Sequence, residues 1–134
     1  MSGARGGMET PASWKVLMVL GNQTPFRRLM IAIRAEGHEI VSITDQFQGV
    51  TLVDDVQPDI ILLDAEVPES WRTCSRIRVM VNIPIILIGL KAPQNAWERA
   101  VGEGADAYLS VFTGPREAIA TAGAILRRYR KTFR

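Results

Sequence analysis

An aspartate at the end of an apolar run is the residue of this sequence best placed to do chemistry. The run Ile60 to Leu63 leads directly into Asp64, and a second acid, Glu66, follows two positions later. A lone carboxylate binds Mg²⁺ weakly, so Asp64 is by itself a weak metal candidate, and Glu66 could supply a substitute ligand. The structural alternatives are that Asp64 bonds to nearby backbone and that Glu66 faces water.

Other kinds of chemistry find little support in the residue types. The chain has one cysteine, Cys74, and one histidine, His38, so it lacks the residues for an internal disulfide or a structural zinc site. We expect Cys74 to be a small core residue and His38 to lie on the surface. Glycine-rich nucleotide-binding loops and the H-E-x-x-H pattern do not occur. We therefore predict that the protein is not an enzyme and needs no cofactor, with Mg²⁺ as the one ion to consider.

Length and composition predict one compact domain. The chain has 134 residues, of which 47% are hydrophobic, and this suffices for a single core. Residues 1–13, rich in small residues, are interpreted as a disordered leader with Met8 as an alternative start, and residues 14–134 as the domain. The apolar stretches are too short to span a bilayer and no secretory signal is visible, so we expect a cytoplasmic protein.

Five short apolar runs alternate with segments of helical period. Continuous apolar runs are typical of parallel strands that are covered on both faces. The pattern predicts an α/β, flavodoxin-like fold: a doubly wound five-stranded parallel sheet in the order 2-1-3-4-5, with five helices. The expected strands are 16–20, 39–43, 59–63, 84–88 and 107–109, and the expected helices begin near residues 24, 47, 71, 96 and 115.

In open parallel sheets, functional residues gather at the carboxyl ends of the strands. In this chain the positions concerned are Gly21, Asn22, Asp64 and Gly89, together with the residues that follow Tyr108. We therefore expect these residues to surround one pocket at the edge of the sheet.

Three stretches in this order resemble the receiver domain of two-component response regulators. They are Pro58 to Asp64 with Pro68 four residues later, Ile83 to Ile86, and Gly104 to Leu109, and the resemblance extends over nearly all of residues 15 to 130. It implies the receiver fold, a role in phosphorelay signalling, and Asp64 as the phosphoacceptor position. Phosphoryl transfer also requires an acidic pair with a divalent cation, and a hydroxyl and a lysine that hold the phosphoryl oxygens.

The chain departs from the receiver pattern at those supporting positions. The acidic pair falls on Gly21 and Asn22, the hydroxyl residue on Gly89, and the lysine on Val111. Four departures at one pocket indicate an atypical receiver, or pseudo-receiver, that works without phosphorylation as a protein-interaction module. The alternative is a conventional receiver that is phosphorylated on Asp64, with the metal held by Asp64, Glu66 and backbone.

By its position, Tyr108 matches the aromatic residue that moves when a receiver is activated. In the family, this residue packs inward when the hydroxyl residue moves to the phosphoryl group, and Gly89 has no side chain to move. A ligand at Asp64 therefore has no evident means of acting on Tyr108. Lys91 could reach towards Asp64 and imitate the charge balance of an activated receiver, or it could be a solvated loop residue.

The expected partners follow from the resemblance and from the charge distribution. The family's dimer and effector face would here include Trp97, Arg99, Tyr108 and Arg116, so we expect a homodimer, or a sensor kinase or effector as partner. The formal net charge is only +2, yet residues 127–134 carry five cations and no acid. This segment is interpreted as helix capping, with an acidic protein, a lipid surface or nucleic acid as alternative targets. A third possible function is that of a small-ligand or nucleic-acid binder that uses the pocket or this basic segment.

Overall fold

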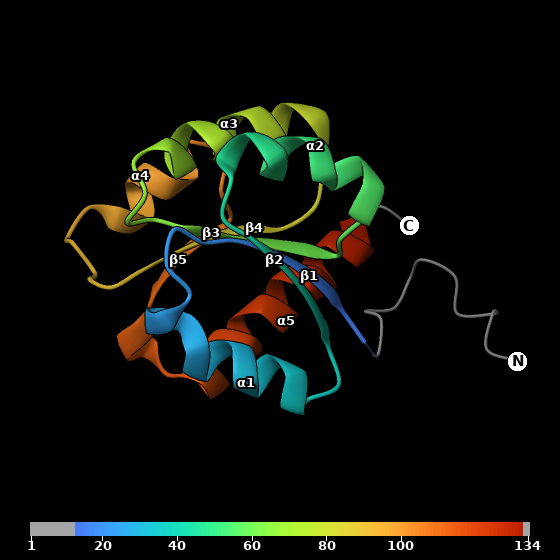
Figure 1. Cartoon of the computed structure of the whole chain (residues 1–134), viewed down its shortest axis with the longest axis vertical. Helices are drawn as coiled ribbons and strands as arrows, with labels where there is room; N and C mark the ends of the chain where they lie inside the picture. Colours follow the sequence, from blue (N-terminus) through green and yellow to red (C-terminus); the bar gives the residue numbers. More distant parts are fainter. Residues whose placement is uncertain (1–12, 133–134) are drawn as a thin grey trace, which may run out of the picture.

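A parallel five-stranded sheet forms the centre of the molecule (Figure 1). The structure, a computed structural model, describes residues 13–132, and side chains up to residue 129. The sheet has the order β2-β1-β3-β4-β5, which confirms the predicted topology. Its strands are β1 (Lys15–Val19), β2 (Glu39–Ile43), β3 (Ile60–Asp64), β4 (Ile85–Gly89) and β5 (Ala107–Ser110).

Helices cover both faces of this sheet (Figure 1). On one face lie α1 (Arg27–Ala35) and α5 (Pro115–Thr132), and on the other lie α2 (Gln46–Val56), α3 (Glu69–Met80) and α4 (Ala96–Gly102). Two short 3₁₀ turns, η2 (Thr24–Phe26) and η3 (Val111–Thr113), precede α1 and α5. The result is the three-layered arrangement that alternating strands and helices predict.

The alternation of side chains along each strand divides the core into two layers. From β1, Val16 and Met18 pack on the α1–α5 side, whereas Leu17 and Val19 pack on the side of α2, α3 and α4. All four side chains are at most 1% exposed, so each contributes about 1.5–3 kcal/mol of transfer free energy. Because both faces of the central strands β1, β3 and β4 are covered, these strands are almost entirely apolar, whereas the edge strand β2 contains Glu39 and Ser42 and is only partly buried.

At the amino ends of the strands, Asp106 ties two helices to the sheet. Its carboxylate accepts hydrogen bonds from Arg78 of α3 at 3.0 Å, from the Ile85 N–H of β4 at 2.9 Å, and from the Tyr129 hydroxyl of α5 at 2.8 Å. Burial and the hydrogen bond with Asp106 raise the pKa of Tyr129 to about 12. Tyr129 therefore stays a neutral donor at physiological pH.

Three local features differ from the sequence predictions. Phe26, the last residue of η2, has φ −104° and ψ 8° and caps the start of α1, so the first helix has two parts. The sequence pattern does not predict η3, whose first turn is stabilised because Ser110 Oγ accepts the Phe112 N–H at 3.2 Å. His38 is half-buried rather than on the surface: its ring stacks on Trp14 at 4.0 Å, its Nδ1 accepts the Trp14 N–H, and burial lowers its pKa.

The predictions for the two ends of the chain can be compared with the structure only in part, because both ends extend beyond the described residues. The predicted leader lies outside the described residues except for Ser13, whose hydroxyl donates to the Gly37 carbonyl at 2.8 Å. In the basic segment 127–134, Arg127 and Arg128 are exposed, and the side chains from residue 130 onward lie outside the described part. Within residues 13–132, no helix has the length and apolar character needed to cross a membrane.

Candidate functional site

The carboxyl ends of the central strands meet at one edge of the sheet, as predicted. Parallel pairing places Asp64 beside Ile88 and Gly89 beside Ser110. The loop after β1 completes the group, because the Gly21 N–H donates to Asp64 Oδ2 at 2.8 Å. The register of the strands and the loop after β1 thus bring residues from four separate parts of the sequence to one site.

Asp64 is the centre of this site. The residue is only 3% exposed, and its second oxygen, Oδ1, accepts the Glu66 N–H at 2.9 Å. Backbone donors therefore engage both carboxylate oxygens, and they offset the cost of burying the charge. This matches the structural alternative for Asp64, a carboxylate that bonds to nearby backbone.

Gly21 and Asn22 do not rebuild the acidic pair of the receiver pattern. A Cβ atom at Gly21 would lie 2.5 Å from Val67 Cγ2 and 3.4 Å from Asp64 Oδ2, so a side chain there would require Val67 to move. Asn22 is exposed, and its Oδ1 accepts the Thr24 N–H at 3.1 Å. The amide of Asn22 thus supports the turn before α1.

Gly89 is overlaid by two polar side chains. A Cβ atom at this position would meet the hydroxyl of Tyr108 and would lie 3.0 Å from Glu66 Oε2. Glu66 does not simply face water, because Oε2 accepts the Leu90 N–H at 2.8 Å. The space that a side chain at position 89 would take is therefore filled from β5 and from the loop after β3.

Tyr108 is held in an inward position. Its side chain packs in the core layer of α2, α3 and α4, the residue is 7% exposed, and its hydroxyl donates to the carbonyl oxygen of Lys91. Burial raises the pKa of the phenol, and the nearby carboxylates of Glu66 and Asp64 raise it further. Tyr108 is therefore neutral and remains a hydrogen-bond donor at ordinary pH.

A second aromatic residue fixes Tyr108 from the side of α3. The ring of Trp71 stacks on Tyr108 with 6.4 Å between centroids and 16° between planes, and the Arg99 guanidinium lies 3.8 Å from the Trp71 ring centre. Trp71 Nε1 also donates to the Ala65 carbonyl at 3.2 Å. Sequence reasoning did not find this stack; the available signal was the large aromatic residue Trp71, seven positions after Asp64.

The remaining predicted positions, Lys91 and Val111, make no hydrogen bond or ion pair with Asp64 in the described part of the chain. Lys91 is exposed, and it forms no ion pair with Asp64 in the described part of the chain. Val111 lies in η3 and packs against the α1–α5 core layer, on the other face of the sheet from Tyr108. Thus no lysine or arginine among the residues with described side chains forms an ion pair with Asp64.

The donor set does not fit Mg²⁺. This ion demands octahedral oxygen coordination, whereas among residues 13–132 no group of three or more His, Cys, Asp or Glu could hold a metal. The two carboxylates of the site, Asp64 and Glu66, already accept backbone N–H groups. These two acids supply fewer charged oxygen ligands than the receiver pattern, which adds an acidic pair to its aspartate.

Comparison with known proteins gives this site a family context. No protein-family model matches the chain. The chain is 30% identical over 120 residues to the phosphate regulon transcriptional regulatory protein PhoB of Pseudomonas aeruginosa, and 29% identical over 116 residues to the DNA-binding response regulator MtrA of Mycobacterium tuberculosis. These alignments cover 85% of this chain but only 52% and 51% of the relatives, so the chain spans about half their length.

Solved structures agree on the fold. A receiver domain protein of Methanospirillum hungatei has a TM-score of 0.77 at 16% identity, over 88% of this chain and 97% of that one. The BeF3-activated N-terminal receiver domain of RstA from Klebsiella pneumoniae has a TM-score of 0.77 at 19% identity, over 84% and 98%.

The sheet order, the aspartate at the end of β3 and these similarities define the class: an α/β domain of the receiver type. More particularly, its sequence is similar to about half of two regulators: the transcriptional regulatory protein PhoB of Pseudomonas aeruginosa and the DNA-binding response regulator MtrA of Mycobacterium tuberculosis.

Proposed function

We propose that this domain is a pseudo-receiver, which acts in two-component signalling through protein contacts and without phosphorylation. The position of Tyr108 carries the proposal, because its hydroxyl stands where a side chain at position 89 would begin. Receivers resemble one another in using a hydroxyl side chain at this position as the moving part. Here that part is missing, and its space is occupied.

The surroundings of Asp64 support the same proposal. Phosphorylation adds a dianionic group, which must be neutralised by cations or by fixed donors. In this site Gly21, Asn22 and Val111 contribute no charge, and the Asp64 oxygens already accept two N–H groups. A phosphoryl group at Asp64 would thus lack the partners that stabilise it.

Because Tyr108 is held in one position, we expect the neighbouring face of α4, β5 and α5 to keep one conformation that can bind a partner. On α4, Trp97 and Val101 are 50% and 51% exposed, and their spacing of four residues places them on one side of the helix. Arg116 at the start of α5 is also exposed. The proposed partner is a sensor kinase, an effector or a second copy of the chain, docked on the face formed by α4, β5 and α5.

The direct test is exposure to a small phosphodonor. We expect that incubation with acetyl phosphate and Mg²⁺ leaves the intact mass unchanged, because the site lacks the metal ligands and the cationic partner that the reaction needs. The measurement is intact-protein mass spectrometry, with a conventional receiver treated in parallel as positive control.

The contrary outcome defines the alternative function. A gain of one phosphoryl mass that is absent in Asp64→Asn would identify a conventional receiver phosphorylated on Asp64. Asp64→Asn keeps the size of the side chain and one carbonyl oxygen, so it is the matched control.

A further inference from the structure

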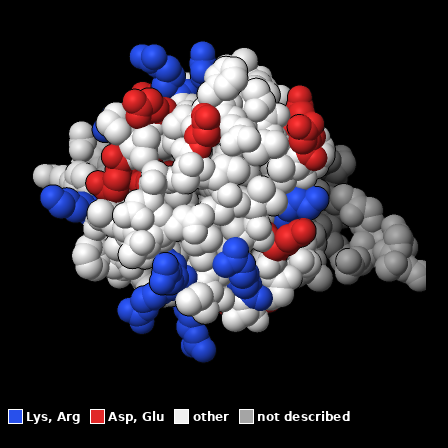
Figure 2. All heavy atoms as spheres, viewed as in Figure 1, with Lys and Arg blue, Asp and Glu red and all other residues white. Residues whose placement is uncertain are grey.

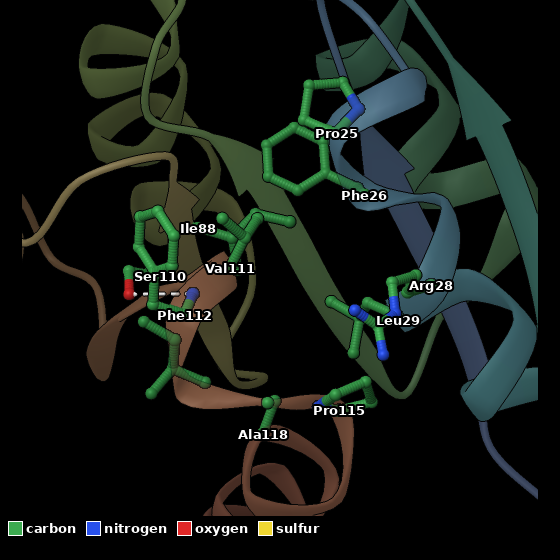
Figure 3. A pocket seen from close by; sticks show the side chains of 12 residues that line it. Pro25, Phe26, Arg28, Leu29, Ile88, Ser110, Val111, Phe112, Pro115 and Ala118 are labelled. Atoms are coloured by element: carbon green, nitrogen blue, oxygen red, sulfur yellow. Dashed lines mark hydrogen bonds between the residues drawn. The ribbon is translucent and has the colours of Figure 1, made fainter.

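A pocket lies on the opposite face of the sheet from Tyr108 and Trp71. It opens between η2 and the start of α1 on one side, and η3 and the start of α5 on the other (Figure 3). Its volume is about 420 Å³, which falls within the range of sites for small molecules. This pocket does not include Asp64, but it adjoins the candidate site described above, because Ile88 and Ser110, which pair with Asp64 and Gly89 in the sheet, belong to its lining.

The walls of the pocket are largely apolar. Phe26 and Leu29 line it from the side of α1, and Val111 and Phe112 line it from η3, across the cavity (Figure 3). Val111 occupies the position at which the receiver pattern has lysine. Because residue 111 is valine, this wall of the pocket is apolar. The replacement of lysine by valine thus removes a cation that phosphoryl transfer needs and at the same time supplies an apolar wall to this pocket.

One cation lies at the edge of these apolar walls. Arg28 lines the pocket, is exposed, and has no ion-pair partner among the described residues. The first turn of α5 adds Pro115 and Ala118 to the lining. Glu117 belongs to the same turn but is not a lining residue. Arg28 is thus the charged side chain of the pocket, and it favours an anion.

The surface around the mouth of the pocket is also positively charged. Figure 2 shows Lys and Arg side chains gathered along the lower edge, over α1. Arg27 and Arg34 of this helix are exposed as well. A field of this sign attracts an anionic ligand to the mouth of the pocket before it makes contact.

We propose that this pocket binds a small amphipathic acid, a molecule with one anionic group and an aromatic or branched apolar body. The anionic group pairs with Arg28, and the apolar body lies against Phe26, Leu29 and Val111. Such a ligand is a way to regulate a domain of this fold through a pocket that does not contain Asp64. The proposal does not depend on whether Asp64 is phosphorylated.

The test compares two probes of nearly equal shape, 1-naphthaleneacetate and its neutral amide, by titration of the ¹⁵N-labelled protein. We expect saturable shifts of the backbone amides of Arg28, Val111 and Phe112 with the acid, and about three- to fivefold weaker binding of the amide, as an exposed ion pair provides. Absence of saturable shifts, equal affinity for the amide, or shifts confined to another part of the protein would overturn the proposal.

Two neighbouring arginines supply matched variants. Arg28→Gln is expected to reduce the affinity for the acid to that for the amide, whereas Arg27→Gln is expected to lower the affinity for the acid by much less and to leave that for the amide unchanged, because Arg27 does not line the pocket. Both side chains are exposed, so both variants are expected to fold. Phe112 lines the pocket and is 83% exposed. Phe112→Ala removes this part of the pocket wall and should weaken the binding of both probes. An equal effect of the two arginine variants would show attraction to the surface rather than binding in the pocket.

Discussion

Gly89 and Tyr108 must be considered together. The hydroxyl of Tyr108 reaches the carbonyl of Lys91 only because no Cβ atom stands at position 89. The same glycine leaves room for the Glu66 carboxylate to accept the Leu90 N–H. At the scale of single residues, the absence of one side chain thus allows two others to settle over the end of β4.

The first prediction concerns this missing Cβ atom. Gly89→Ala should destabilise the fold by about 1–3 kcal/mol, the usual cost of overpacking a filled site, because Tyr108 must leave its position. Gly102→Ala is the control, since a Cβ atom there meets nothing within 4 Å, and it should change stability by no more than about 1 kcal/mol, in the stabilising direction. The measurement is equilibrium unfolding in urea. Equal stability of Gly89→Ala and the wild type would mean that Tyr108 does not need the space.

Sequence reasoning predicted the place of Asp64 but not its partners. The place follows from an apolar run that must be a buried strand, and from the rule that such strands present their carboxyl ends at one edge. The partners depend on loop conformation: the Gly21 N–H reaches Asp64 through the turn after β1, and Trp71 stacks on Tyr108 through the first turn of α3. Neither contact produces a periodic signal in the sequence.

At the scale of elements, α5 is held to the sheet by a polar contact as well as by its apolar face. Ala118, Ile119, Ala122, Ile125 and Leu126 line that face and are buried, as their helical spacing predicts. Near the end of the helix, Tyr129 donates to Asp106, which also accepts from Arg78 of α3. One carboxylate therefore joins helices from opposite faces of the sheet.

The second prediction concerns the hydrogen bond between Tyr129 and Asp106. Tyr129→Phe should lower the free energy of unfolding by about 1.5 kcal/mol, the lower end for a hydrogen bond to a charged group, because the aromatic packing is kept and only the donor is lost. Thr121→Ala, which removes a hydrogen bond within the same helix to the Glu117 carbonyl, should change it by less than about 0.5 kcal/mol. Urea unfolding of both variants checks this, and an unchanged midpoint for Tyr129→Phe would contradict it.

The elements themselves were largely predictable, and the short turns were not. Short apolar runs indicated where the strands lie, and Pro115 indicated the start of α5. The turn η3 depends on one side-chain contact, between Ser110 and the Phe112 N–H, and three residues are too few to give a helical period. Since η3 places Val111 on the α1–α5 side, the pocket there could not be predicted either.

At the scale of the whole molecule, the two faces of the sheet have different properties. On the face of α2, α3 and α4, Tyr108 fills the space beside Gly89 and Trp71 stacks on it, whereas the face of α1 and α5 has an open pocket with Arg28 at its edge. In a receiver with a mobile aromatic residue, a signal at Asp64 would change the α4–β5 surface. In this molecule, that surface is expected to keep one arrangement.

The backbone amide spectrum of the ¹⁵N-labelled domain, recorded with and without Mg²⁺ and beryllofluoride, tests this central claim most directly. Beryllofluoride imitates a phosphoryl group, so a conventional receiver responds with shifts that extend from its aspartate to its fifth strand. We predict no saturable change at Tyr108, along β5 or in α4, because Tyr108 is already inward and Gly89 offers no hydroxyl to the ligand. Saturable shifts of these amides that disappear in Asp64→Asn would contradict the account.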